Sequence, residues 1–359
     1  MVNNILHVEG YQKIHSEILR EDREFIVHVP NEYDKTNERY PVVFVLNSDY
    51  PAYLVNAVST LDLLADAARI PQVITVGIKT PDHAKDLFPV PHPKIPGSGK
   101  ASEFLRFLVE ELIPSIDEQF RTLPHRILYG QSNPGAFAIF SLLAKPDYFN
   151  GVIAGSPMLG WGIDVYHEAA KKLFADGVAS NSFLYIEYGD DDYDKVIDSV
   201  PGFIDLLSQI ASPEFKWSSR IIEGEGHAPL TVLYNGLAMI YPHWQITSKQ
   251  AEEEGLEGVE RFYRNLEQRY GIPVRIPATV LSDAAVNWLL LGKHENARPF
   301  LSKLIAEYPD SSGGFYLLGV VEERSDNVSM AISLYEKALE LEPKNIGAKE
   351  KLEQIKKLG

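Results

Sequence analysis

The sequence predicts a mostly parallel α/β sheet flanked by helices, followed by a small all-helical unit. Residues 1–246 alternate short continuous apolar runs, typical of strands buried on both faces, with segments whose apolar residues recur at helical spacing. Residues 278–359 carry small and apolar residues at one constant repeat distance, which is typical of paired helices. We expect residues 247–277 to form a helix and a linker between the two parts.

Apolar runs mark the expected strands of the first part. They lie at 25–29, 40–46, 72–78, 126–130, 151–157, 183–189 and 216–224. Helical spacing is found at 53–70, at 102–120 and directly after Ser132. In a sheet of this kind, functional side chains gather where the carboxyl ends of the strands meet.

The composition argues against several classes of protein. The formal net charge is −16, whereas nucleic acids and anionic membranes are bound by clustered Lys and Arg. The chain has no cysteine, which excludes disulfides, thiolate catalysis and cysteine-ligated zinc. No apolar run approaches the ~20 residues of a membrane span, and no zinc motif is present. Residues 1–10 show no export signature, which favours the cytoplasm, with export and removal of a signal as the alternative.

The turn GQSNPG at 130–135 joins a buried strand to a helix. Such a turn exposes the hydroxyl of Ser132 at the strand end, and the amides of the following helix favour negative charge beside it. The usual pattern has a glycine two residues after the serine, whereas this chain has Pro134 there and Gly135 one residue later. Asn133 keeps its amide N–H and is the expected first donor to an oxyanion. The alternative is a structural serine that caps the helix.

An acid and a histidine should follow a nucleophilic serine in chain order, each after a later strand. Asp190, Asp191 and Asp192 follow the run at 183–189, and His227 follows the run at 216–224. A neutral imidazole, with an unperturbed pKa near ~6.5, can accept the serine proton, and a carboxylate behind it fixes the tautomer. We favour Asp192 as this acid. The other interpretations are Asp190 or Asp191 as the acid, a Ser–His dyad, or a solvated acidic loop.

With these residues placed, the chain resembles the Putative esterase branch of the α/β hydrolases, which includes esterase D-like and siderophore (enterobactin-type) esterases. The resemblance covers essentially the whole length and rests on the opening strands, on IAGSPMLGW and on EGEGHAPLTVLYNGLAMIY. It implies an α/β-hydrolase fold and a serine esterase with a catalytic triad and an oxyanion hole. The turn departs from the family's usual glycine-histidine-serine-leucine-glycine-glycine at Gln131, Asn133 and Pro134.

The resemblance also implies a second oxyanion amide in the loop after the strand at 40–46. The family usually has leucine-aspartate-glycine there, and this chain has a different sequence. Ser48, Asp49 and Tyr50 are the candidates, of which we take Asp49. Tyr50 and Trp161 are candidates for lining the substrate pocket, and core packing is the alternative for both.

The last part of the chain repeats at an interval of 34 residues (331 minus 297; 343 minus 309). The matched pairs are Ala297 and Ala331, Leu301 and Tyr335, Leu304 and Ala338, and Pro309 and Pro343. This is the tetratricopeptide period, so we expect two such repeats and a capping helix at 348–358. Two repeats are fewer than the ~3 of an independent solenoid. We therefore expect this unit to dock on the hydrolase part and to position substrate, a protein partner or a second protomer, with a stabilising appendage as the alternative.

Together these features predict a serine carboxylic-ester hydrolase that acts through an acyl-enzyme on a small ester. Siderophore esters, acylated sugars and other acyl esters are the candidate substrates. No cofactor, metal or nucleic acid is expected. The alternative is a catalytically decayed hydrolase domain that serves, with its repeats, as a protein-binding scaffold, and the altered turn is the observation that favours it.

Overall fold

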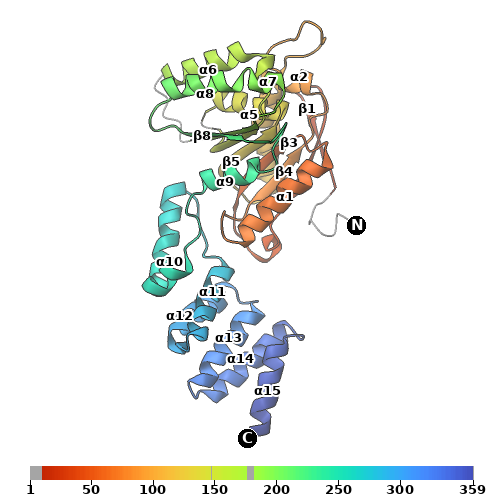
Figure 1. The fold of residues 1–359 in the computed structure, drawn as a ribbon. Helices are drawn as coiled ribbons and strands as arrows, with labels where there is room; N and C mark the ends of the chain where they lie inside the picture. Colours follow the sequence, from red (N-terminus) through yellow and green to blue (C-terminus); the bar gives the residue numbers. More distant parts are fainter. Residues whose placement is uncertain (1–9, 147, 176–181, 359) are drawn as a thin grey trace. The chain divides into compact units, whose positions relative to one another are not determined.

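The computed structural model describes residues 10–146, 148–175 and 182–358. The chain divides into two compact units, residues 1–242 and 243–359. The first unit contains an eight-stranded sheet, and the described residues of the second unit form helices (Figure 1).

The sheet of the first unit is mostly parallel. Its strands are β1 (Gln12–Ser16), β2 (Glu21–His28), β3 (Tyr40–Leu46), β4 (Ile74–Ile78), β5 (Thr122–Gln131), β6 (Gly151–Gly155), β7 (Phe183–Gly189) and β8 (Lys216–Ile222). Their order across the sheet is β1-β2-β4-β3-β5-β6-β7-β8. The β1–β2 and β2–β4 pairs are antiparallel, and all other pairs are parallel. The predicted α/β-hydrolase architecture is confirmed, and the carboxyl ends of β3 to β8 meet at one edge.

Helices cover both faces of this sheet. They are α1 (Pro51–Asp66), α2 (His83–Leu87), α3 (Ala101–Phe107), α4 (Ile113–Gln119), α5 (Asn133–Ala144), α6 (Ile163–Ala175), α7 (Asp194–Ile197), α8 (Val200–Ile210) and α9 (Val232–Ile240). Helices α5, α6 and α8 lie on one face, and α1 and α9 lie on the other (Figure 1).

The helix expected at 102–120 is interrupted. A π-helical turn, Leu108–Leu112, separates α3 from α4, and the Ile113 N–H donates to the Leu108 carbonyl five residues back. Pro114 follows directly and lacks an amide N–H, so it cannot donate to the carbonyl four residues earlier. The wider π-helical turn accommodates this missing hydrogen bond. The spacing of apolar residues in the sequence does not reveal it.

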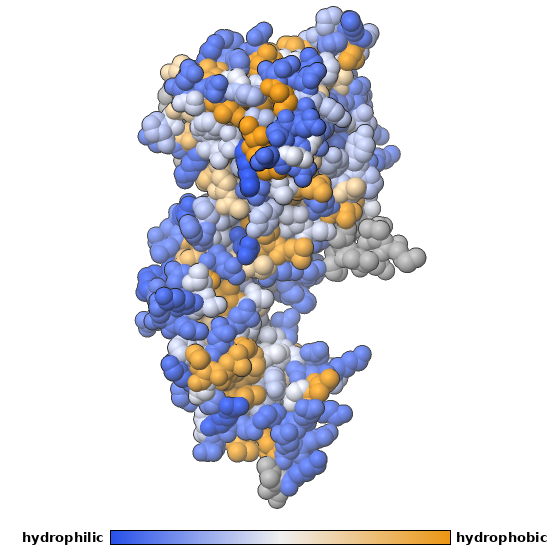
Figure 2. Space-filling view, viewed as in Figure 1, coloured by the Kyte–Doolittle hydropathy of each residue, from blue (hydrophilic) through white to orange (hydrophobic). Residues whose placement is uncertain are grey.

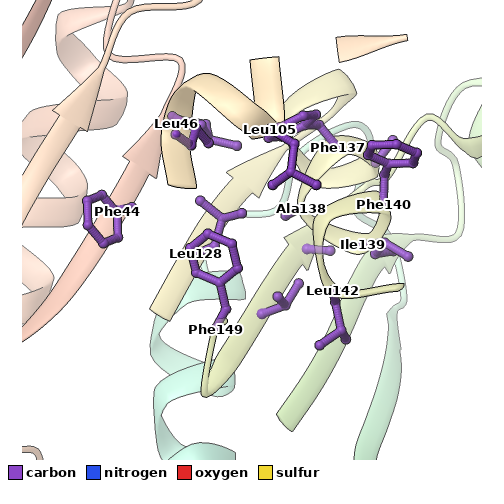
Figure 3. Close-up of a cluster of buried hydrophobic side chains, with 14 of the residues drawn as sticks. Phe44, Leu46, Leu105, Leu128, Phe137, Ala138, Ile139, Phe140, Leu142 and Phe149 are labelled. Carbon is purple, nitrogen blue, oxygen red and sulfur yellow. The ribbon is translucent and has the colours of Figure 1, made fainter. Parts of the chain in front are cut away.

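Buried aromatic and aliphatic side chains fix the helix that follows Ser132. Phe44 and Leu46 of β3, Leu128 of β5 and Phe137 of α5 belong to one core cluster (Figure 3). Every residue of α5 from 134 to 143 is buried. The amino end of α5 is therefore held rigidly against the carboxyl end of β5.

A buried histidine in β5 makes the stability of the first unit depend on pH. His125 is 5% exposed, and its Nε2 atom has no hydrogen-bond partner among the described residues. Burial lowers the pKa of His125 from 6.5 to about 4. As the pH falls through this interval, the unfolded chain binds a proton that the folded chain does not. The free energy of unfolding should therefore fall by about 3 kcal/mol on this account.

Chemical denaturation of the wild type and of His125→Phe at pH 7 and pH 4.5 tests this expectation. The variant should lose about 2 to 3 kcal/mol less over the interval, because its ring takes no proton in either state. Each protein is compared with itself, so a change in packing at neutral pH cancels. An identical pH dependence in the two proteins would contradict the assignment to His125.

The second unit consists of helices throughout its described part. They are α10 (Ser248–Tyr270), α11 (Ala278–Leu290), α12 (His294–Glu307), α13 (Ser312–Arg324), α14 (Val328–Leu341) and α15 (Ile346–Leu358). Helix α10 begins with a capping box formed by Thr247 and Gln250 and is broken at Gly255. Helices α11 and α12 pack as one pair and α13 and α14 as another. A Cβ atom at Gly319 would lie 2.6 Å from the Tyr335 ring, so glycine lets α13 and α14 approach closely.

The molecular surface is dominated by polar residues on the face seen in Figure 2, with hydrophobic side chains scattered among them. Within the described ranges, no helix has the length and apolar character needed to cross a bilayer.

Candidate active site

Ser132 lies in a strained turn between β5 and α5. Its backbone has φ 65° and ψ −129°, a conformation that costs free energy for any residue but glycine. A Cβ atom at Gly130 would lie 2.5 Å from the carbonyl carbon and oxygen of Pro134, so only glycine fits there. The Ser132 N–H donates to the Gly155 carbonyl at 2.8 Å, which ties the turn to β6. The Ser132 side chain makes no capping hydrogen bond to α5.

The residues that depart from the usual turn pattern have clear structural roles. Pro134 lies in the first turn of α5, where its missing N–H would have no intrahelical partner. A Cβ atom at Gly135 would lie 2.8 Å from the Gly155 carbonyl oxygen. The displaced glycine therefore allows the close contact between α5 and β6.

His227 and Asp192 form a hydrogen-bonded pair. The distance from His227 Nδ1 to Asp192 Oδ1 is 2.6 Å, and the Asp192 side chain is fully buried. Burial, the largest effect, raises the pKa of Asp192, but hydrogen bonds from His227, Ser156 and the Tyr193 amide outweigh it and hold the pKa below its usual value. The carboxylate is thus ionised and accepts a proton-bearing Nδ1.

The neighbouring aspartates lie elsewhere. Asp190 is exposed, and its Oδ1 accepts the Gly224 N–H at 2.8 Å, which links the loops after β7 and β8. The Asp191 side chain is exposed, and its amide donates to the Glu225 carbonyl at 3.2 Å. Of the three, the structure brings only Asp192 into contact with His227.

Backbone hydrogen bonds distinguish the three amides of the loop after β3. The Ser48 N–H donates to the Ile78 carbonyl at 3.1 Å, and the Tyr50 N–H donates to the Asn47 carbonyl at 3.3 Å. The Asp49 amide has no such acceptor among the described residues. Of the three candidate amides, that of Asp49 is thus the one without a backbone acceptor in the described part of the chain.

Side chains also hold this loop in place. Asp49 Oδ2 accepts the Thr80 N–H at 2.5 Å. Asn47 has a φ of 66°, and its Oδ1 lies 3.1 Å from His83 Nε2. Burial lowers the pKa of His83, so its imidazole is kept neutral. Asn133, the first residue of α5, has an amide without an intrahelical acceptor.

The two aromatic pocket candidates have different surroundings. Tyr50 is 59% exposed, and its ring lies 6.2 Å from that of Tyr53. Trp161 stacks on Phe88 with ring centroids 4.9 Å apart, and the Lys195 ammonium lies 5.2 Å from its ring. Trp161 therefore packs against the end of α2 and against a side chain of α7, whereas the Tyr50 ring is exposed to solvent.

Two residues of the site were not predicted from the sequence. The Tyr193 ring stacks on the His227 imidazole with centroids 4.3 Å apart. The Ala228 N–H donates to Ser156 Oγ at 2.8 Å, and Ser156 also stabilises the ionised Asp192. In the sequence, the one feature that pointed to Ser156 was the Ser156-Pro157 pair directly after β6. No sequence feature pointed to Tyr193. No group of three or more potential metal ligands occurs in the described part of the chain.

Comparisons with known proteins find esterases that are similar to this chain. The model of the family described as Putative esterase matches residues 16–227. Ferri-bacillibactin esterase BesA of Bacillus subtilis is 31% identical over 141 residues, 31% of this chain and 49% of that protein. Siderophore triacetylfusarinine C esterase of Aspergillus fumigatus is 34% identical over 76 residues, 20% of this chain and 26% of that protein. The chain thus spans half or less of the length of these curated relatives.

Solved structures share the fold. An IroE-like serine hydrolase from Shewanella oneidensis superposes with a TM-score of 0.67 at 22% identity, covering 83% of this chain and 100% of that one.

Proposed function

The chain belongs to the Putative esterase family, and from this premise we propose that it hydrolyses small carboxylic esters through an acyl-enzyme on Ser132. The observation that carries the proposal is the 2.6 Å hydrogen bond between His227 and the buried Asp192, on the loops after β7 and β8. With Nδ1 held by the carboxylate, Nε2 is the basic nitrogen. The strained Ser132 lies at the same edge of the sheet.

In the proposed reaction, Ser132 Oγ attacks the ester carbonyl carbon while His227 Nε2 takes the hydroxyl proton. The carbonyl oxygen becomes an oxyanion, which accepts hydrogen bonds from the Asn133 and Asp49 amides. The intermediate collapses, the carbon–oxygen bond to the alcohol breaks, and His227 returns the proton to the leaving alcohol. Water then attacks the acyl-enzyme by the same steps in reverse, which releases the carboxylic acid and restores Ser132.

We place siderophore esters first among the substrates, ahead of acylated sugars, because both curated relatives carry siderophore esterase names. Tyr50, which is 59% exposed, and Tyr193, which is 60% exposed and stacks on His227, are aromatic side chains available to contact such a substrate. Parallel hydrolysis assays with siderophore esters, acetylated sugars and nitrophenyl esters would rank these classes.

A fluorophosphonate probe tests the proposed nucleophile. We expect the wild type to be labelled, with the phosphonate mapped by peptide mass spectrometry to Ser132, and Ser132→Ala to take up no label. An unlabelled wild type, or equal labelling of Ser132→Ala, would contradict the proposal and favour the scaffold interpretation. Circular dichroism of both proteins serves as the control for folding.

We also propose that α11 to α15 are two tetratricopeptide-like repeats with a capping helix. The support is that residues at the 34-residue offset occupy equivalent buried positions. These are Ala297 with Ala331, Leu301 with Tyr335, and Leu304 with Ala338. A protein partner or self-association through these helices is part of the proposal, and sedimentation velocity of the full chain would detect the latter.

A further inference from the structure

The loop that carries His227 is held to the sheet by hydrogen bonds at three of the four residues that follow His227. The Ala228 N–H donates to Ser156 Oγ at 2.8 Å, and Gln131 Nε2 donates to the Pro229 carbonyl at 3.1 Å. Thr231 Oγ1 donates to Glu187 Oε1 at 2.5 Å. The acceptor or donor in each case comes from β5, β7 or the residue directly after β6.

Glu187 is the unusual member of this set, because it is a charged residue type that is 0% exposed, in β7 between β6 and β8. Its carboxylate accepts three hydrogen bonds from neutral groups. Besides Thr231, the donors are the Tyr185 hydroxyl at 2.5 Å and Asn235 Nδ2 at 2.6 Å, both to Oε2. Burial, assisted by Glu187, raises the pKa of Tyr185, so the phenol keeps the proton it donates. A buried carboxylate is costly unless it is satisfied in this way.

The hydrogen bond between Thr231 and Glu187 does not stabilise the end of α9. Thr231 is the residue directly before α9, where a threonine side chain ordinarily caps the helix. The Thr231 hydroxyl makes no capping hydrogen bond and binds Glu187 instead. The Thr231 hydroxyl is therefore directed at β7 and not at the amides of α9.

We infer that Glu187 is a positioning residue for His227, acting through Thr231. Strand β7 leads into Asp192 and also holds, through Glu187, the loop that follows His227. One rigid strand thus sets the places of both partners of the 2.6 Å hydrogen bond. Because proton transfer depends steeply on this geometry, releasing the loop should slow the chemical step and leave substrate binding unchanged. The inference rests on the proposed esterase function.

Steady-state kinetics of matched variants test the inference. Thr231→Val keeps the side-chain shape and removes the hydroxyl, and we expect kcat to fall about 10-fold with KM within about twofold of wild type. Thr231→Ser restores the hydroxyl and should recover most of kcat. Tyr185→Phe removes a different donor from the same carboxylate without touching the loop, and its kcat should stay within about twofold of wild type.

Two results would overturn the inference. One is an unchanged kcat in Thr231→Val, even with a lowered Tm. The other is a fall in kcat for Tyr185→Phe as large as that for Thr231→Val, which would indicate a general loss of stability. A second readout does not need activity: the Nδ1 proton of His227 should give a hydrogen-bonded NMR resonance in the wild type that broadens or shifts in Thr231→Val and returns in Thr231→Ser. If Ser132-dependent hydrolysis is absent, the proposed function fails, and this resonance still decides whether Glu187 positions His227.

Discussion

Replacing Asp192 by asparagine is expected to lower kcat for ester hydrolysis by about 10⁴-fold with little change in KM. The Asp192 carboxylate accepts the Nδ1 proton of His227 at 2.6 Å, which leaves Nε2 free to accept the proton of Ser132. An asparagine can donate to Nδ1 and thereby favour the tautomer that carries its proton on Nε2, which cannot act as a base. Steady-state hydrolysis of a nitrophenyl ester measures the loss.

The adjacent aspartates provide matched controls for this change. Asp191→Asn removes the same charge from an exposed side chain, and its kcat should stay within about threefold of wild type. Asp190→Asn should have a small effect on kcat, since Oδ1 of the new amide can still accept the Gly224 N–H. A loss in Asp191→Asn as large as that in Asp192→Asn would assign the acid to another residue.

The lowered pKa of Asp192 also predicts how kcat/KM depends on pH. A carboxyl with a lowered pKa stays ionised when the pH falls to the usual pKa of an aspartate. Asp192 should therefore contribute no ionisation to the profile of kcat/KM between about pH 5 and 8.

Much of the fold could be predicted because the physical signals are local. The continuous apolar runs that became β3, β4 and β7 are long enough, and apolar enough, to be recognised as strands buried on both faces. The strand, turn and helix around Ser132 are likewise encoded within some 20 neighbouring residues. The order of Ser132, the acidic cluster and His227 followed from the rule that functional groups lie after successive strands.

Asp192 and Asp49 were chosen from the sequence, but the contacts that single them out, like those of Glu187, join segments that are distant in the chain. Asp190, Asp191 and Asp192 are chemically identical in the sequence, and only the fold of their loop shows which one meets His227. The Asp49 amide is distinguished by what its neighbours donate to, which no residue pattern records. In the sequence Glu187 is one residue of an expected strand, and no pattern there indicates its hydrogen bond with Thr231.

A methyl group at Gly189 is expected to separate the acid from the base and so to reduce kcat by about 10²-fold. Gly189 ends β7, and a Cβ atom there would lie 2.0 Å from the Glu225 carbonyl oxygen and 2.4 Å from that of Gly226. These are backbone atoms and cannot rotate away, so Gly189→Ala must push back the segment directly before His227. Overpacking of this kind should also lower the free energy of unfolding by about 1 to 3 kcal/mol.

Gly202→Ala is the matched control, because nothing lies within 4 Å of a Cβ atom at this exposed position in α8. Its kcat should equal that of wild type, and its stability should be unchanged or higher by about 0.5 kcal/mol. Urea denaturation and steady-state kinetics on both variants separate the two effects of Gly189→Ala. If that variant kept the wild-type kcat while losing stability, the loop before His227 would be able to yield without disturbing the bond to Asp192. The loop contacts of Ser156, Gln131 and Glu187 would then be strong enough to hold His227 without the close approach at Gly189.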